Sequence, residues 1–313
     1  MIPGGSGQVG AILRRALSTA GHEVVVLSRS PQREEVYWDG HTLGPWARAL
    51  ESAGAVINLA GRSVNCRYSA ANGREIMQSR VASTAVVGRA IAGCTVPPPV
   101  WLQASTATIY AHRYDAPNDE PGGILGGDEP DVPDTWRFST DVARAWEREL
   151  AAAATPRTRK VAMRSAMVMS PDRGGVFDVL LGLVRRGLGG KAGDGRQYVS
   201  WVHHEDFARG VAWLIEHDEL EGAVNVAVPN PLPNVEFMRA LRDAWGARVG
   251  LPATRPMLEA GALLLRTETE LILKSRRVVP TRLLEAGFQF RFPAWAAAAQ
   301  DLCARWRTRR SVT

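Results

Sequence analysis

The first 61 residues alternate between helical spacing of hydrophobic positions and short continuous hydrophobic runs. Apolar residues at i, i+3 and i+4 over 9–20 predict an amphipathic helix that ends at Gly21. Continuous runs predict strands at 23–27, 36–38 and 55–61, and a helix near 45–53 lies between the last two. Strands that alternate with helices are typical of a parallel sheet with helical crossovers.

The same alternation continues to residue 228, interrupted by a long loop over 111–136 that is rich in Gly, Pro and Asp. The chain is therefore predicted to be an α/β protein with a doubly wound parallel Rossmann sheet. Ligands of such sheets bind outside the carboxyl ends of the strands. The further predicted strands are 100–106, 160–170 and 223–228, and the further predicted helices are 72–92, 138–154, 175–186 and 204–217.

Two domains are expected. Residues 1–228 form a dinucleotide-binding Rossmann domain, and residues 229–313, with helical patterns separated by Pro and Gly, form a small, mostly helical C-terminal substrate lobe. Only Met1 to Pro3 precede the glycine-rich loop, whereas a central strand normally has about 5 to 6 residues. The first strand is accordingly expected to be truncated, so that either its start lies upstream of this sequence or the protein is less stable than its relatives.

The segment GGSGQVG carries a dinucleotide-binding fingerprint, with Gly4, Gly7 and Gly10 at three-residue spacing directly before a helical pattern. The first glycine permits a tight turn, the second lets the backbone approach a pyrophosphate, and the third allows close packing of the helix. The helix N-terminus then presents amides to the phosphates. Gln8 and Val9 complete the predicted cofactor loop.

The end of the second strand indicates which cofactor binds. Ser28 and Arg29 stand about 20 residues after the loop, where an acidic residue would accept hydrogen bonds from the ribose of NAD. An arginine at this place favours the 2′-phosphate of NADP(H); the alternative is a solvent-facing arginine. Asn58, Ala60 and Gly61, at the end of a later strand, are expected to face the same cofactor.

A candidate catalytic and substrate site is expected at later strand ends and in the glycine-rich segment 187–210. Hydroxyls there would donate to a carbonyl, His and Asp would move a proton near neutral pH, and basic groups would hold an anion. In the alternative interpretation, the segment only joins the lobe to the Rossmann domain. The catalytic candidates are Ser105, Thr106, His203 and Asp206, and the substrate-binding candidates are Arg164, Lys191, Arg196, Gln197 and Trp201.

Composition excludes several other classes. The net charge of +6 is spread along the chain apart from the short RWRTRR tail, so no nucleic-acid partner is expected. No run approaches the roughly 18 apolar residues of a membrane helix, and the N-terminus lacks a signal pattern, which predicts a cytoplasmic protein without a membrane partner. Cys66, Cys94 and Cys303 are isolated, so neither disulfides nor a metal site are expected.

Several segments together carry a family resemblance: GGSGQVG, NLAG at 58–61, EIMQSR ending at Arg80, RSAMVMSPDRGG, GDGRQYVSWVHHED, NVAVPNP and VVPTRLLEAGFQFRFP. Nearly the whole chain resembles the NAD(P)-dependent epimerase/dehydratase superfamily of extended short-chain dehydrogenases/reductases. It resembles in particular the "epimerase family protein" branch with a C-terminal domain of unknown function. The resemblance implies a Rossmann domain, a small C-terminal substrate lobe and NADPH as ligand.

The sequence departs from this family at the Tyr-x-x-x-Lys dyad, in which a lysine lowers the tyrosine pKa for proton transfer. Ser139 and Ala143 stand where the dyad would be, followed by Glu147. The leading hypothesis is an NADP(H)-binding oxidoreductase or epimerase acting on a small carbonyl or nucleotide-sugar-like molecule through other groups. The alternatives are a non-catalytic NADP(H) sensor or regulator and, more weakly, a structural oligomer. A homodimer is expected.

Overall fold

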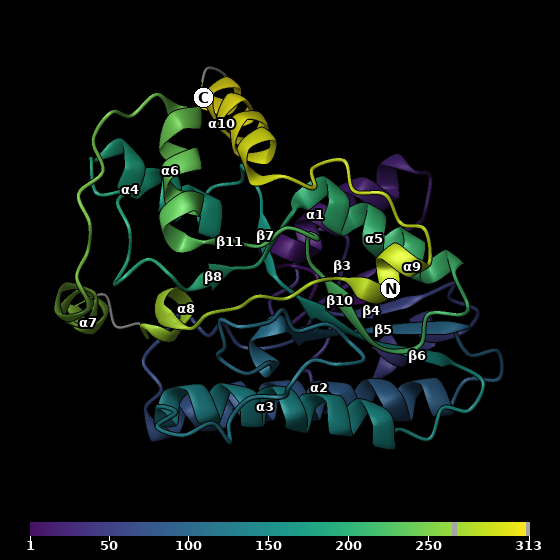
Figure 1. The fold of residues 1–313 in the computed structure, drawn as a ribbon. Coiled ribbons are helices and arrows are strands. Elements are labelled where there is room, and N and C mark those ends of the chain that lie inside the picture. The colour runs from purple at the N-terminus through teal and green to yellow at the C-terminus, as the bar shows by residue number, and fades with distance from the viewer. Residues whose placement is uncertain (265–267, 311–313) are drawn as a thin grey trace.

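A parallel β-sheet forms the centre of the computed structural model, which describes residues 1–264 and 268–310 (Figure 1). Three strands pair in one half and four in the other. Backbone hydrogen bonds join the halves, because the amides of Ile57 and Leu59 donate to the carbonyls of Met1 and Pro3, at 2.9 and 2.8 Å. The order is β3 (Glu35–Tyr37), β2 (Val26–Ser28), β1 (Ile2–Pro3), β4 (Val56–Asn58), β5 (Val100–Thr106), β6 (Arg159–Ser165) and β10 (Gly222–Val226).

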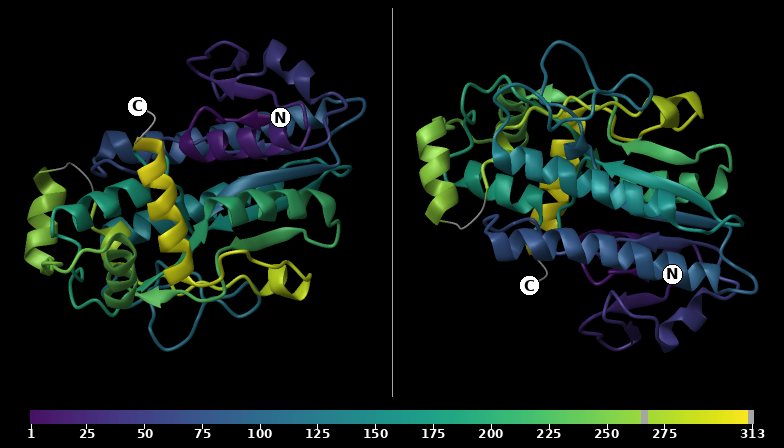
Figure 2. Two further views of the ribbon diagram at one scale, coloured as in Figure 1. Left: turned by 90° about the horizontal axis from the view of Figure 1, so that it is seen from above. Right: turned by 90° about the horizontal axis from the view of Figure 1, so that it is seen from below.

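Helices cover both faces of this sheet, which confirms the predicted doubly wound α/β fold. The helices α1 (Gln8–Thr19) and α5 (His204–Glu216) pack together on one face, and α2 (Ala70–Ala92) and α3 (Asp134–Ala152) pack together on the other (Figure 2). Strands buried on both faces have continuous hydrophobic runs in the sequence. For this reason the hydrophobic runs predicted the strands.

Two predicted elements differ from those observed. The predicted strand 160–170 is divided at Ala166, whose amide donates to the carbonyl of Val226 at 3.0 Å, and the chain then leaves the sheet as β7 (Met167–Met169). The predicted helix 45–53 is the short 3-10 helix η1 (Pro45–Leu50). A segment of six residues lacks the length that stabilises an α-helix.

A second hydrophobic core lies outside the sheet, where aromatic side chains of several helices meet. Trp295 stacks on Phe237 with ring centroids 4.0 Å apart and meets Trp201 edge-on at 4.8 Å. The lobe built around this second core contains elements from both sides of residue 228. The domain boundary predicted at that residue stays a prediction. The elements that contribute to the core of this lobe include α4 (Val176–Arg185), β8 (Tyr198–Val199), β9 (Trp201–His203), β11 (Leu232–Pro233), α6 (Asn234–Trp245) and α10 (Trp295–Arg310). The helix α7 (Arg255–Leu264) follows α6 in the chain.

The chain between the lobe helices returns to the Rossmann domain. This returning segment, residues 268–292, contains α8 (Glu270–Leu273) and α9 (Thr281–Glu285). Leu283 and Phe288 belong to the hydrophobic core around the sheet, and the hydroxyl of Ser200 accepts a 2.9 Å hydrogen bond from the amide of Val278. The C-terminal part of the sequence is thus interwoven with the N-terminal part.

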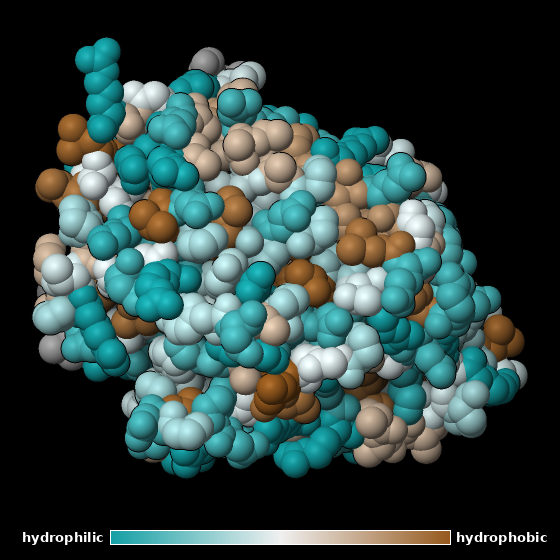
Figure 3. All heavy atoms as spheres, viewed as in Figure 1, coloured by the Kyte–Doolittle hydropathy of each residue, from teal (hydrophilic) through white to brown (hydrophobic). Residues whose placement is uncertain are grey.

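The surface in Figure 3 carries hydrophobic residues in small groups among hydrophilic ones. None of the described helices has both the length and the apolar character needed to cross a bilayer.

Replacing Trp295 by Ala is expected to lower the free energy of unfolding by about 3 to 5 kcal/mol, because it removes a fully buried indole from the second core. Its indole N–H also donates to the carbonyl of Phe237 at 2.8 Å. Urea denaturation followed by circular dichroism measures the change. The control is Val249→Ala at a side chain that is 61% exposed, where less than about 0.5 kcal/mol is expected. Equal losses for the two variants would contradict this account.

Candidate functional site

The glycine loop leaves β1 and enters α1 beside the carboxyl end of β4. Gly4 has φ +72°, and a Cβ there would lie 2.6 Å from the Cα of Ala60. A Cβ on Gly10 would lie 2.1 Å from the carbonyl oxygen of Gly5. No side chain fits either place, so two glycines of the fingerprint are required by close backbone contacts.

Gly7 has a different role, because it begins α1 and nothing crowds it. A Cβ there would meet its nearest atom only at 3.9 Å. Gly7 is the N-cap of α1 without a side-chain cap, and the first helical turn contains no acidic residue. The amides at this end are therefore directed at an anion-binding position.

A hollow of about 980 Å³ opens in front of these amides. Of the predicted cofactor residues it is lined by Gly4, Gly7, Ser28, Arg29, Ala60 and Gly61. Sequence reasoning missed the remaining wall, which comes from the glycine loop, the end of β3, the loop after β4 and one side of α2. The only signal in the sequence was the position of some of these residues directly after a predicted strand. These missed residues include Ser6, Trp38, Asp39, Arg62, Ser79 and Ser83.

Arg29 lies at the rim between this hollow and a neighbouring one of about 580 Å³. The neighbouring hollow is also lined by the hydroxyls of Ser6 and Ser30 and by the guanidinium groups of Arg14 and Arg33, and the carboxylates of Glu34 and Glu35 complete it. Ser28 is buried and its hydroxyl accepts from the amide of Ser30 at 3.2 Å. This set of donors suits a phosphate group.

The other predicted cofactor residues shape the site from behind. Asn58 is buried, donates to Gln103 Oε1 at 3.0 Å and accepts from the amide of Ala60 at 3.1 Å, so it fixes the turn after β4. Val9 packs against the sheet core. The side chain of Gln8 lies against Gly175, and its buried Nε2 has no hydrogen-bond partner among the described residues.

Ser105 and Arg164 join one buried polar network rather than an open site. The Ser105 hydroxyl donates to Glu147 at 2.6 Å, and Arg164 donates to both oxygens of that carboxylate at 2.8 and 2.7 Å. Arg164 also donates to the hydroxyl of Tyr110 at 3.0 Å. Thr106 is only half-buried, and its hydroxyl accepts from the amide of Thr108 at 3.1 Å.

His203 and Asp206 hold the C-terminal segment in place. His203 is fully buried, its Nε2 lies 3.1 Å from Asp301 Oδ2, and its ring lies 4.0 Å from that of Phe292, centroid to centroid. Asp206 accepts from the amides of Arg291 and Phe292, both at 2.8 Å. These contacts fit the alternative interpretation, in which the segment joins the lobe to the Rossmann domain. Catalysis by either residue stays a prediction.

The four remaining substrate candidates are divided between surface and core. Lys191 and Arg196 are exposed, and Arg196 lies over the ring of Tyr114 at 5.4 Å. Gln197 is buried and its Nε2 donates to the carbonyls of Ala192 and Ile272 at 3.0 and 3.1 Å. Trp201 lies in the second core. Gln197 lines a pocket of about 400 Å³ together with His112 and Trp136, whereas Lys191, Arg196 and Trp201 do not line it. Substrate binding by the four residues stays a prediction.

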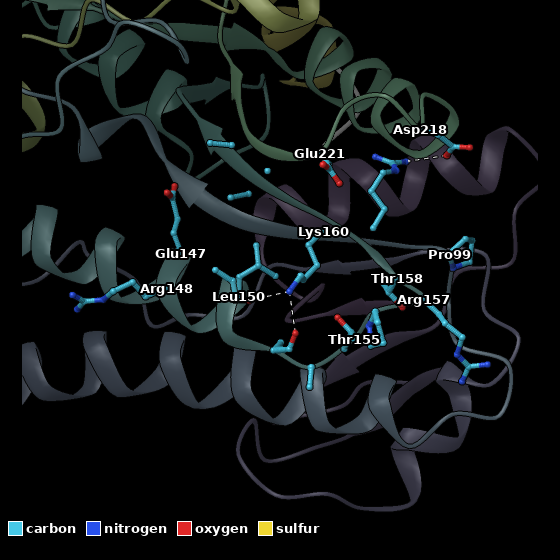
Figure 4. A pocket seen from close by; sticks show the side chains of 18 of the residues that line it. Pro99, Glu147, Arg148, Leu150, Thr155, Arg157, Thr158, Lys160, Asp218 and Glu221 are labelled. Atoms are coloured by element: carbon cyan, nitrogen blue, oxygen red, sulfur yellow. Dashed lines mark hydrogen bonds and ion pairs between the residues drawn. The ribbon is translucent and has the colours of Figure 1, made fainter.

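A hollow of about 1570 Å³ lies at the opposite edge of the sheet, between α3 and the beginnings of β6 and β10 (Figure 4). Lys160 points from its floor to the carbonyls of Ala151 and Ala153 at 3.0 and 2.9 Å, and Arg159 lies 3.6 Å from Asp218. This edge is at the amino ends of the strands, whereas ligands of doubly wound sheets bind at the carboxyl ends. The smaller hollow at the glycine loop is the candidate site.

The parallel sheet, the glycine loop and the hollow at its end define a dinucleotide-binding protein of the Rossmann class. Residues 1–227 match the NAD dependent epimerase/dehydratase family, and residues 253–302 match a domain of unknown function, DUF1731. The chain therefore belongs to the NAD dependent epimerase/dehydratase family, which confirms the resemblance seen in the sequence.

Two relatives match over almost their whole length. The epimerase family protein SDR39U1 of Bos taurus is 33% identical over 312 residues, which cover 97% of this chain and 99% of the relative. An epimerase family protein of Mycobacterium tuberculosis is 31% identical over 292 residues, which cover 92% of each chain.

Solved structures agree with the observed fold. Human epimerase family protein SDR39U1 (isoform 2), crystallised with NADPH, is 29% identical with a TM-score of 0.85, over 97% of this chain and 98% of that one. UDP-glucose 4-epimerase of Thermus thermophilus with NAD is 19% identical with a TM-score of 0.72, over 98% of each chain. At this low identity, the comparison with the Thermus thermophilus enzyme shows only that the two proteins share a fold.

The buried histidine predicts a loss of stability in acid. Burial lowers the pKa of His203 from 6.5 to about 4. The unfolded chain therefore takes up a proton at this residue below pH 6.5, the folded chain only near pH 4, and acid favours unfolding in that window. Between pH 6.5 and pH 4, the free energy of unfolding should fall less in His203→Gln than in the unaltered protein, by on the order of 3 kcal/mol.

Urea denaturation at half-unit pH steps measures the slope, with His22→Gln at an exposed histidine as the control. If the slope of unfolding free energy against pH is the same in His203→Gln as in the unaltered protein, the contact between His203 and Asp301 does not depend on the neutral ring.

Proposed function

We propose that this protein binds NADP(H) and acts as an oxidoreductase or epimerase on a small carbonyl or nucleotide-sugar-like molecule. The observation that carries the proposal is the hollow at the glycine loop, where unobstructed α1 amides and Arg29 surround one space. The NADPH-bound human SDR39U1 structure supports the same ligand.

The residues of the hollow fit the parts of such a cofactor. Gly7 and the first amides of α1 would hold the diphosphate, because the close contacts of Gly4 and Gly10 leave backbone rather than side chains at this place. Ser28 and Arg29 would hold the 2′-phosphate. When bound, the nicotinamide group supplies or accepts a hydride. The half-buried Thr106 hydroxyl, at the carboxyl end of β5, would orient a substrate oxygen.

From the sequence alone we further propose that the protein is located in the cytoplasm. On the same ground we propose that it forms a homodimer and that its partner is a small molecule.

The cofactor preference is tested by isothermal titration calorimetry with NADPH and NADH. We expect tighter binding of NADPH by roughly ten- to hundredfold, since a charge-assisted hydrogen bond to phosphate contributes about 1.5 to 3 kcal/mol. Arg29→Ala should remove most of this preference with little effect on NADH. Arg239→Ala, at an exposed arginine of α6, is the matched control. Equal affinities of the unaltered protein for the two cofactors would refute the assignment.

A further inference from the structure

The pocket of about 400 Å³ that Gln197 lines is separate from the cofactor hollow. Among the described residues, none lines both spaces. Three parts of the chain that are distant in sequence surround the pocket, namely residues within 112–136, 193–197 and 254–273. Pockets that hold small molecules begin at about this size, and they combine hydrophobic or aromatic walls with a few well-placed polar groups.

The walls of this pocket include three aromatic side chains that contact one another. The ring centroid of His112 lies 5.0 Å from that of Tyr114 and 4.9 Å from that of Trp136. His112 and Trp136 are half-buried, so part of each ring is accessible from the pocket. Aromatic side chains pair with other rings in offset-stacked or edge-to-face geometry. The walls therefore favour a planar ring over a flexible chain.

Gln197 supplies the pocket with a hydrogen-bond acceptor. The residue is 2% exposed, and its Nε2 donates to the carbonyls of Ala192 and Ile272 at 3.0 and 3.1 Å. The reverse orientation of the amide would place Oε1 against two carbonyl oxygens, so these contacts fix the orientation of the side chain. With both Nε2 protons in use, Oε1 is the atom that Gln197 can offer to a ligand, and it is an acceptor.

His112 supplies a hydrogen-bond donor. Its Nδ1 accepts from the amide of Ser275 at 2.8 Å, so the neutral ring carries its proton on Nε2. Burial lowers the pKa of His112, and the charges of Lys274 and Arg276 lower it further, while Glu129 opposes them. The ring is therefore neutral at pH 7, and Nε2 can donate to a ligand.

The returning segment positions both of these groups before a ligand binds. The carbonyl of Ile272 holds the amide of Gln197, and the amide of Ser275 holds the ring of His112. The Ser275 hydroxyl donates to the carbonyl of Arg113 at 3.0 Å, which ties the same stretch to the loop that carries His112. Groups that are already ordered cost little further entropy when a ligand binds.

The charged side chains of the lining do not select an ion. Among the residues that line the pocket they are one carboxylate, Asp194, and one guanidinium, Arg255. Both are exposed, and Arg255 is paired with Glu259 at 3.1 Å. Opposite charges at the surface leave no net field for a charged ligand, whereas burying an unpaired charge is costly. A neutral ligand fits these surroundings.

We propose that this pocket is a small-molecule site in its own right, and that its ligand is a neutral planar heterocycle of one or two rings. The ligand donates a hydrogen bond to Gln197 Oε1, accepts one from His112 Nε2 and places its ring against Trp136. A cyclic amide has both an N–H group and a carbonyl oxygen on one ring and is the simplest such compound. The proposal goes beyond NADP(H) binding and does not depend on it.

The test uses the full chain and 2-quinolinone, a neutral cyclic amide with two fused rings, in isothermal titration calorimetry. We expect saturable binding with a Kd on the order of 100 μM, as is ordinary for a ligand of this size. The compound 1-methyl-2-quinolinone lacks the N–H donor and should bind about tenfold more weakly, because the buried Oε1 is then left without a donor. No saturable binding of 2-quinolinone, or equal affinities for the two compounds, would overturn the proposal.

Two variants locate the binding in this pocket. Gln197→Met keeps the length of the side chain but removes the acceptor, so the two compounds should bind to it with affinities within about twofold of each other. Trp136→Leu should weaken binding of 2-quinolinone by about tenfold and leave NADPH affinity unchanged, since it removes one aromatic wall. The matched control is Trp213→Leu at a half-buried tryptophan of α5, where no change is expected.

Unaltered 2-quinolinone affinity in Trp136→Leu, or an equal loss in Trp213→Leu, would contradict the proposed location even if Gln197→Met does not fold. NADPH titrations of the same samples separate the two proposals of this article. A protein that binds NADPH but not 2-quinolinone contradicts the present inference alone. A protein that binds 2-quinolinone but neither NADPH nor NADH contradicts the proposed function alone.

Discussion

The contact between the glycine loop and the end of β4 fixes the geometry on which the rest of the site depends. Gly4 approaches Ala60 so closely that a methyl group would not fit between them. The same turn is tied through β1, whose few residues exchange backbone hydrogen bonds with neighbours on both sides. β1 joins the two halves of the sheet. The close contact between Gly4 and Ala60 at its end therefore sets the direction of α1 and the position of the hollow in front of it.

The returning segment is the second constraint. It inserts buried charged groups between α3 and the short 3-10 helix η2 (Ala107–Ile109), where Arg276 and Lys274 donate to Thr108 and face Glu270. Charges removed from water cost several kcal/mol each unless they are paired, so this arrangement tolerates few alternatives. The result is a rigid connection between the lobe and the carboxyl edge of the sheet, built from residues separated by 166 and 168 positions in the chain.

The same connection accounts for the pairing of the buried polar residues in the glycine-rich segment 187–210. Its buried polar residues are already engaged: Gln197 with carbonyls of the returning segment and its own loop, His203 with Asp301, and Asp206 with two amides near Phe292. A buried polar group must be satisfied, and here the partners are supplied by the chain itself. Residue types that suit catalysis suit this joining role equally well.

The sequence by itself determined the features that depend on local spacing. Hydrophobic periodicity predicted the doubly wound sheet, the glycine triplet predicted the loop, and Arg29 was placed at a strand end by counting residues. The tertiary structure alone decided which polar groups meet. The Ser139–Glu270 pair joins residues 131 positions apart, and the burial of His203 depends on a helix from the far end of the chain. Periodicity reports which face of an element is buried, whereas the partner of a buried charge depends on how distant elements pack, and no local pattern encodes that.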